Sequence, residues 1–157
     1  MDSIPMTLKG YQKLQDEVRY LKNVERPQVV ASISSARALG DLSENAEYHA
    51  AKDRQGLIEA RISDIEDKIG KALVIDVSKI KSDTIKFGAT VEIIDDDSDV
   101  ISKFQIVGSD EADIKSGFLP ITSPIAKALI GKKKNDAIEV STPGGIKNYT
   151  ILDIKFI

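Results

Sequence analysis

The chain has 157 residues, of which 41% are hydrophobic and 30% are charged, as is ordinary for a folded globular protein. It has no cysteine, which excludes disulfides, thiolate zinc sites and cysteine nucleophiles. A formal net charge of −3 disfavours a protein that coats nucleic acid by neutralising phosphates. No apolar stretch approaches the roughly 18 residues of a membrane span, so we expect a cytoplasmic protein that binds no membrane.

The first predicted element is a long helix that begins after Thr7, which is suited to cap it, and ends at Gly40. Apolar residues recur along this segment at helical spacing, in two series: Tyr11, Leu14, Val18 and Leu21, then Val29, Ile33 and Ala36. Between the two series stands Pro27, which lacks a backbone N–H and should kink the helix.

A second long helix is predicted from apolar positions separated by alternating steps of four and three, which make a heptad seam. Its members are Ala51, Gln55, Ile58, Ile62, Ile65, Ile69 and Ala72. Since each helix has one seam and few residues connect them, the pattern favours an antiparallel coiled-coil hairpin within a monomer over two chains coiled together. We expect this hairpin to occupy residues 1–76, and helices of about 30 residues would reach roughly 45 Å.

The connection between the helices, residues 41–48, contains three acids, Asp41, Glu44 and Glu47. In one interpretation Asp41 and Glu44 form a capping box for the second helix. In the other, they are weak ligands of Mg²⁺, which commonly takes only one or two protein carboxylates. They would then complete a two-metal phosphoryl-transfer site whose other half belongs to another protein, with Glu47 as a supporting neighbour.

Residues 77–157 have the short β-branched runs and Gly, Pro and Asp clusters of a sheet-rich domain. The predicted strands are residues 89–94, 101–107, 137–141 and 146–154. One helix is predicted after Ser123, with Pro124 at its first position and Gly131 beyond its end. Asp95, Asp97 and Asp99 begin like a calcium loop, but the glycine and glutamate that such a loop needs are missing, so we expect a solvated turn. The whole chain is predicted to be α+β.

The chain resembles the bacterial Gre transcript-cleavage factors, of the GreA type, in motifs that run along nearly its whole length. The motifs are Ile4-Pro5-Met6-Thr7, Arg26-Pro27, Ala36-Arg37, Gly40-Asp41-Leu42-Ser43-Glu44-Asn45-Ala46-Glu47-Tyr48-His49-Ala50-Ala51-Lys52, Ala72-Leu73-Val74-Ile75-Asp76, Phe87-Gly88-Ala89-Thr90-Val91, Ile106-Val107-Gly108-Ser109-Asp110-Glu111-Ala112-Asp113, Ser123-Pro124-Ile125-Ala126 and Thr142-Pro143-Gly144-Gly145. These are unrelated local features that occur in the same order as in that family.

The resemblance implies an N-terminal antiparallel coiled coil followed by an FKBP-like globular domain with a bent antiparallel sheet and one helix. It also implies a partner, RNA polymerase, whose secondary channel the coiled coil enters. There the residues matching Asp41 and Glu44 help to position the second Mg²⁺ and an attacking water, and the polymerase cleaves the 3′ end of backtracked nascent RNA. The factor itself would not be an enzyme, and Mg²⁺ would be shared only in the complex.

The resemblance further implies roles for residues outside the acidic pair. Arg37 and Lys52 match a basic patch that contacts the RNA. Four residues would support the connection: Ser43, Asn45, Glu47 and Tyr48. Four others match the loop through which the globular domain docks on polymerase: Ser123, Pro124, Ile125 and Ala126.

Three other functions compete with this one. One alternative is a protein of the same shape that blocks the channel without promoting cleavage, although the presence of both Asp41 and Glu44 argues against this. Another is a prolyl isomerase or chaperone built on the FKBP-like domain, but residues 77–157 supply few aromatic residues for such a pocket. Cleavage of longer RNA fragments, as in GreB-type factors, is disfavoured because residues 58–66 lack a dense basic run.

Overall fold

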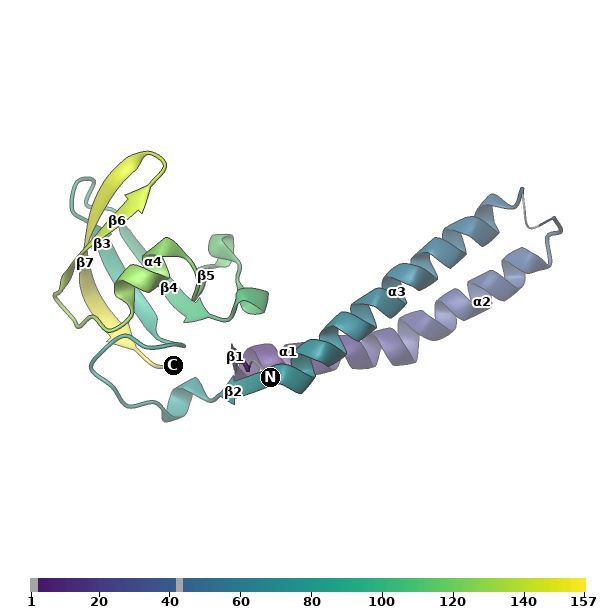
Figure 1. Ribbon diagram of the computed structural model, residues 1–157, viewed down its shortest axis with the longest axis horizontal. Coiled ribbons are helices and arrows are strands. Elements are labelled where there is room, and N and C mark those ends of the chain that lie inside the picture. The colour runs from purple at the N-terminus through teal and green to yellow at the C-terminus, as the bar shows by residue number, and fades with distance from the viewer. Residues whose placement is uncertain (1–2, 42–43) are drawn as a thin grey trace. The chain divides into compact units, whose positions relative to one another are not determined.

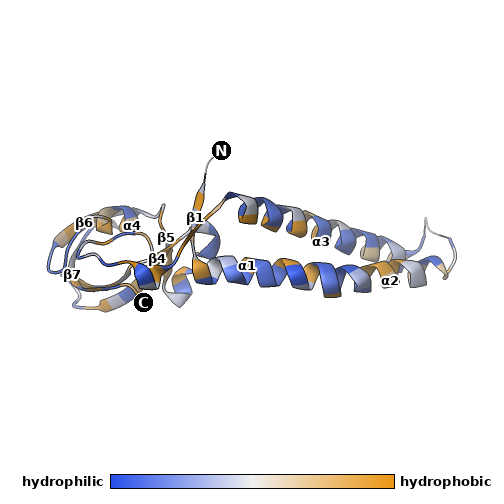
Figure 2. Ribbon diagram, turned by 90° about the horizontal axis from the view of Figure 1, so that it is seen from below, coloured by the Kyte–Doolittle hydropathy of each residue, from blue (hydrophilic) through white to orange (hydrophobic). Residues whose placement is uncertain are grey.

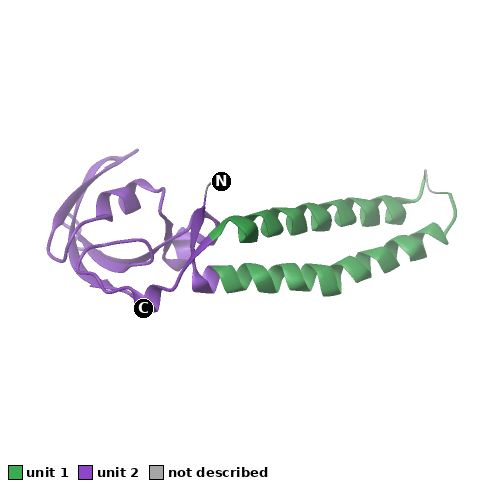
Figure 3. Ribbon diagram, turned by 60° about the horizontal axis from the view of Figure 1, so that its bottom comes forward, with its two compact units in different colours: residues 1–2, 11–72 green, residues 3–10, 73–157 purple. Residues whose placement is uncertain are grey.

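A computed structural model describes residues 3–41 and 44–157. Contacts divide the chain into two compact units, a helical hairpin that includes residues 11–72 and a sheet domain made of residues 3–10 and 73–157 (Figure 3). The first residues of the described chain thus belong to the sheet domain. None of the helices in the described ranges has both the length and the apolar character needed to cross a membrane.

The hairpin is built from α1 (Leu8–Tyr20), η1 (Leu21–Glu25), α2 (Arg26–Arg37) and α3 (Ala46–Lys71). In Figures 1 and 3, α3 returns alongside α2 and α1. The predicted seams are confirmed, since most of their members are buried: Leu14, Leu21, Val29, Ile33, Ala36, Ala51, Ile58, Ile62 and Ile65. Tyr11, Val18, Gln55, Ile69 and Ala72 are half-buried. Figure 2 shows the alternation of apolar and polar residues along the helices that these seams require.

The interruption predicted at Pro27 takes the form of a π-helical turn just before it, at Leu21–Glu25. The N–H of Arg26 donates to the carbonyl of Leu21, five residues back, where an α-helix would use a residue four back. Pro27 lacks an N–H and its ring crowds the preceding turn, so an ordinary helical ladder cannot continue through this point. The expected irregularity is therefore confined to one wider turn.

Of the two predicted ends of the first long helix, which comprises α1, η1 and α2, the start is confirmed and the end is not. The Thr7 hydroxyl accepts a hydrogen bond from the N–H of Gly10 at 3.1 Å, which confirms Thr7 as the cap of α1. The prediction that Gly40 directly ends the helix was wrong, because α2 ends at Arg37. Gly40 has φ +123°, so it turns the chain only after a short non-helical step.

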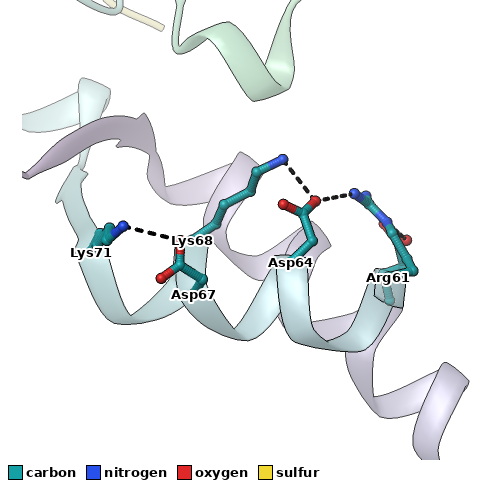
Figure 4. A network of polar contacts seen from close by, with 6 residues as sticks. Arg61, Asp64, Asp67, Lys68 and Lys71 are labelled. Atoms are coloured by element: carbon teal, nitrogen blue, oxygen red, sulfur yellow. Dashed lines mark hydrogen bonds and ion pairs between the residues drawn. The ribbon is translucent and has the colours of Figure 1, made fainter. Parts of the chain in front are cut away.

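An ion pair between Arg61 and Glu17 joins α3 to α1 on the hairpin surface. The Arg61 guanidinium donates two hydrogen bonds, of 2.6 and 2.9 Å, to the carboxylate of Glu17 on α1. It also pairs with Asp64, which in turn pairs with Lys68 (Figure 4). The hydrogen bond from Arg61 holds the pKa of Glu17 below its ordinary value of 4.5. Because Glu17 and Arg61 come from different helices, this pair links them directly.

Lowering the pH should weaken this link. The folded-state pKa of Glu17 is depressed, so its contribution to stability is fully present above about pH 4.5 and is lost as pH falls through the folded-state pKa. Glu17→Gln should therefore be less stable than wild type at pH 7, by on the order of 0.5 kcal/mol after solvent screening, and equal to it near pH 2. Urea unfolding at both pH values measures the difference, with Glu139→Gln on the sheet domain as the control. An equal deficit at both pH values would contradict the charge argument.

The sheet domain contains a five-stranded sheet with strand order β5-β4-β3-β7-β6. Its strands are β3 (Thr90–Asp95), β4 (Ile101–Val107), β5 (Phe118–Pro120), β6 (Ala137–Thr142) and β7 (Gly145–Lys155). The four predicted strands are confirmed to within one residue at each end. A second, two-stranded sheet pairs β1 (Ile4–Thr7) with β2 (Ala72–Ile75).

The expected antiparallel sheet is correct except at one edge, where β5 pairs with β4 in parallel. The chain reaches β5 after two short 3₁₀ turns, η3 (Ser109–Glu111) and η4 (Ile114–Ser116), and this longer path permits the parallel direction. The register between β3 and β7 shifts between Glu92 and Ile93, and such a bulge bends a sheet.

The helix α4 (Pro124–Leu129) packs against the sheet and closes its core (Figure 1). The Ser123 hydroxyl accepts a hydrogen bond from the N–H of Ala126 at 3.2 Å, which confirms the predicted cap. Gly131 follows the helix with φ +84°, as expected. The buried cluster comprises Ile85, Ala89, Val91, Ile93, Ile106, Ala126, Leu129, Ile138, Val140 and Ile151. The expected turn at Asp95 is also present, because its carboxylate accepts the N–H of Asp97 at 2.9 Å.

Candidate functional site

Asn45 joins the two helices at the connection between them. Its side-chain oxygen accepts the N–H of Tyr48 at 3.0 Å, so Asn45 is the N-cap of α3. Its side-chain nitrogen donates to the carbonyl of Ala36 at 2.5 Å, in the last turn of α2. One amide group thus satisfies an end group of each helix. The sequence had suggested only that Asn45 supports the connection.

The capping-box interpretation of Asp41 and Glu44 was wrong. The helix α3 begins at Ala46, and the cap is Asn45 instead of Asp41. Asn45 prevails because its short amide can accept from the start of α3 and donate to the end of α2. Asp41 and Glu44 therefore precede the helix and are not needed as its capping groups.

The three acids of the connection share one open depression of about 350 Å³. It is lined by Leu39, Asp41, Glu44, Asn45, Ala46 and Glu47. Asp41, Glu44 and Glu47 are exposed, and Glu47 lies in the first turn of α3, where the helix dipole favours negative charge. The structure thus brings together the acids that the sequence selected. Ser43, the remaining predicted supporting residue, lies outside the described residues.

The connection offers carboxylate oxygens, which are the donors that Mg²⁺ prefers, so its chemistry fits that ion. Within residues 3–41 and 44–157, however, no three acidic or histidine side chains are arranged to hold a metal. The described part of the chain offers carboxylates on an exposed surface, with no closed cage around them. Such groups suit a metal whose other ligands come from elsewhere.

Two basic residues lie on the helices beside the acids. Arg37 is in the last turn of α2, and its guanidinium carbon lies 5.9 Å from the centre of the Tyr48 ring on α3. The ring of Tyr48 also meets the ring of His49 edge to face, with centroids 5.5 Å apart. Lys52, one turn further along α3, is exposed and donates to the side-chain oxygen of Gln55 at 3.2 Å. Tyr48 is half-buried and connects the two helices through Arg37.

The second predicted interaction site is the start of α4 in the sheet domain. Pro124 is exposed, Ser123 and Ile125 are half-buried, and Ala126 is fully buried in the core. Ser123 fixes the loop by capping the helix. The loop therefore has a rigid inner side, formed by Ala126, and presents Pro124 outward.

Comparison with known proteins covers both units. Residues 4–74 match the family model described as "Transcription elongation factor, N-terminal", and residues 80–156 match "Transcription elongation factor, GreA/GreB, C-term". A helical hairpin with an acidic connection, followed by a sheet domain, is thus the arrangement of a two-domain transcription elongation factor. The chain belongs to the GreA/GreB family.

Individual relatives match over their full length. The chain is 55% identical over 157 residues to transcription elongation factor GreA of Phenylobacterium zucineum and 54% identical to that of Caulobacter vibrioides, with 100% of each chain covered. Among solved structures, it is similar to GreA factor homolog 1 of Thermus thermophilus, at 23% identity with 98% and 99% of the two chains covered. The TM-score of that pair is 0.44, which is too low to support a structural comparison.

Proposed function

We propose that this protein acts as a monomer on cytoplasmic RNA polymerase and stimulates cleavage of the 3′ end of nascent RNA in backtracked complexes. The supporting observation is the connection between α2 and α3, where Asn45 caps the helix, and Asp41 and Glu44, both exposed, line one depression. The names of the full-length relatives, transcription elongation factors, support an action on transcribing polymerase.

In the proposed mechanism, the hairpin enters the secondary channel of the polymerase and carries Asp41 and Glu44 to its active centre. Asp41 and Glu44 would supply carboxylate oxygens that help to hold a second Mg²⁺ and orient the attacking water. When bound, that ion would supply activation of the water and stabilisation of charge on the phosphate. Asn45 ties the start of α3 to the end of α2, and both acids lie on the connection between these two helices. The protein contributes groups to the site of another enzyme and has no cleavage activity alone.

Residues beside the acids would bind the displaced RNA end. Arg37 and Lys52 offer positive charge to the phosphates, and the Tyr48 ring restrains Arg37 from across the hairpin. The sheet domain, which we propose to be FKBP-like because one helix packs on a bent sheet, would dock at the channel rim. The loop at Ser123 and Pro124 would make that contact, while Ile125 and Ala126 support it from the core.

The direct test uses elongation complexes stalled in a backtracked state with RNA labelled at its 3′ end. Addition of the purified protein should release short labelled fragments and restore elongation, and polymerase without the protein is the control. The protein alone should not cut the same RNA. If it binds polymerase and inhibits synthesis without releasing fragments, it is the non-cleaving channel inhibitor instead.

A prolyl isomerase activity of the sheet domain has little support. Its aromatic side chains Phe104, Tyr149 and Phe156 pack against the buried cluster, so they contribute to the core. A prolyl-peptide assay with the whole protein should show no turnover above background.

A further inference from the structure

The carboxylate of Glu111 binds two segments that are far apart in the sequence. One oxygen accepts both the N–H of Thr7, at 2.8 Å, and its hydroxyl, at 2.9 Å. The other oxygen accepts the N–H of Gly108 at 3.0 Å. Glu111 is half-buried and Thr7 is 7% exposed, so these bonds are partly shielded from water. All of these residues belong to the sheet domain, which includes residues 3–10.

A local role for Glu111 does not account for this arrangement. Its bond to Gly108 caps the short turn η3 to which Glu111 belongs. That role uses one of its two oxygens. The other is bonded to Thr7, 104 residues away, at the end of β1 and the start of α1.

Two glycines make room for this contact. A Cβ atom at Gly10, in the first turn of α1, would overlap the Glu111 carboxylate. A Cβ atom at Gly108 would lie 2.5 Å from the carbonyl oxygen of Pro5. A glycine in a helix costs about 1 kcal/mol relative to alanine, so Gly10 is unfavourable for the helix alone. It is explained by the carboxylate that occupies the space beside it.

The hydroxyl of Thr7 connects the carboxylate of Glu111 to the first turn of α1. Its hydroxyl donates to Glu111 and also accepts from the N–H of Gly10, so the hydroxyl is oriented from both sides. The cap of α1 is thus itself held by a charged group, and bonds to charged groups are stronger than neutral ones.

We propose that Glu111 is a positioning residue that fixes the point where α1 leaves the sheet domain. With the first turn of α1 held by Glu111, the helix that leads to the acidic connection would begin from a fixed point, which would favour productive placement of that connection. This functional consequence rests on the proposed role in RNA cleavage, whereas the contact itself can be tested without polymerase.

The first test measures amide hydrogen exchange in the full-length protein. Glu111→Ala removes both acceptor oxygens, so the amides of Thr7 and Gly108 both lose their bonds. Exchange at these two amides should rise roughly tenfold to a hundredfold, while exchange at Ile93 in the core of the sheet should not change. Glu139→Ala, which removes an exposed acid on β6, is the matched control. Unchanged exchange at Thr7, or an equal rise at Ile93, would overturn the proposal.

The second test measures RNA cleavage over a range of factor concentrations. Glu111→Ala should lower the maximal rate by roughly tenfold and change the half-saturating concentration little. Thr7→Val should have a similar effect, and the double variant should be no worse than either, because both changes break one link. A positioning role would be refuted if the losses of cleavage rate in the two single variants added up in the double variant, or if only the half-saturating concentration changed. If wild type stimulates no cleavage, the proposed function fails, but the exchange result still decides whether the contact exists.

Discussion

Asp41→Asn and Glu44→Gln are each expected to reduce stimulated RNA cleavage by about a hundredfold or more, while binding to polymerase stays close to wild type. Each change keeps the size of the side chain and removes only its charge. A group that acts on a developing charge lowers the rate by that order when it is lost. A few exposed carboxylates contribute little to the affinity of a large interface.

The measurement combines single-turnover cleavage in stalled complexes with competition binding to the same polymerase. The matched control is Glu47→Gln, which removes the same charge from the same depression but from within the first turn of α3. We expect this variant to retain most of the activity. If Glu47→Gln loses as much as Asp41→Asn, the general negative charge of the connection matters and the two acids have no special role. Full activity of Asp41→Asn would remove the central proposal.

The second large effect is expected at Asn45. Asn45→Ala removes the cap of α3 and the bond to Ala36 together. Loss of such a cap costs about 1 kcal/mol of stability. The cleavage rate should fall further than that figure suggests, by about tenfold or more, because the two helix ends that flank Asp41 and Glu44 are no longer tied together. Binding to polymerase should be affected less than the rate.

Asn45→Ser separates the two bonds of Asn45. Serine is a good cap for α3 but its side chain is too short to serve Ala36 as well. Stability close to wild type with reduced cleavage would show that the link to α2 positions the acids. Wild-type cleavage by Asn45→Ser would show that only the cap matters, and wild-type cleavage by Asn45→Ala would show that Asn45 does not position the acids.

The sequence predicted the parts of the fold that depend on periodicity. Both long helices were predicted from the seams, because apolar residues that recur at the helical period, such as Val29 and Ile65, lie on one face and become buried there. The strands β4 and β7 were found because β-branched runs end at glycine, proline and aspartate. β5 was missed, since it is three residues long, contains Pro120 and pairs in parallel with β4.

The candidate site was only partly predictable. The acids were selected by their position between two helices, but the cap of the second helix was assigned to Asp41, and Asn45 was given only a supporting role. The choice of Asn45 over Asp41 depends on the carbonyl of Ala36, which only the folded hairpin places within reach. The contact of Glu111 with Thr7 could not be predicted, because a local sequence pattern does not indicate a bond between residues 104 positions apart.

The π-helical turn before Pro27 has a consequence for helical phase. Seven residues separate Leu14 from Leu21 and Val29 from Ala36, but eight separate Leu21 from Val29, so the heptad carries one surplus residue. In a regular α-helix that residue would rotate everything after it by about 100°, and Val29 would turn away from α3. The wider turn absorbs the surplus locally, and Leu21 and Val29 both remain buried. The residues of α2 after the turn, up to Arg37, therefore keep the same face toward α3 that they would have without the extra residue.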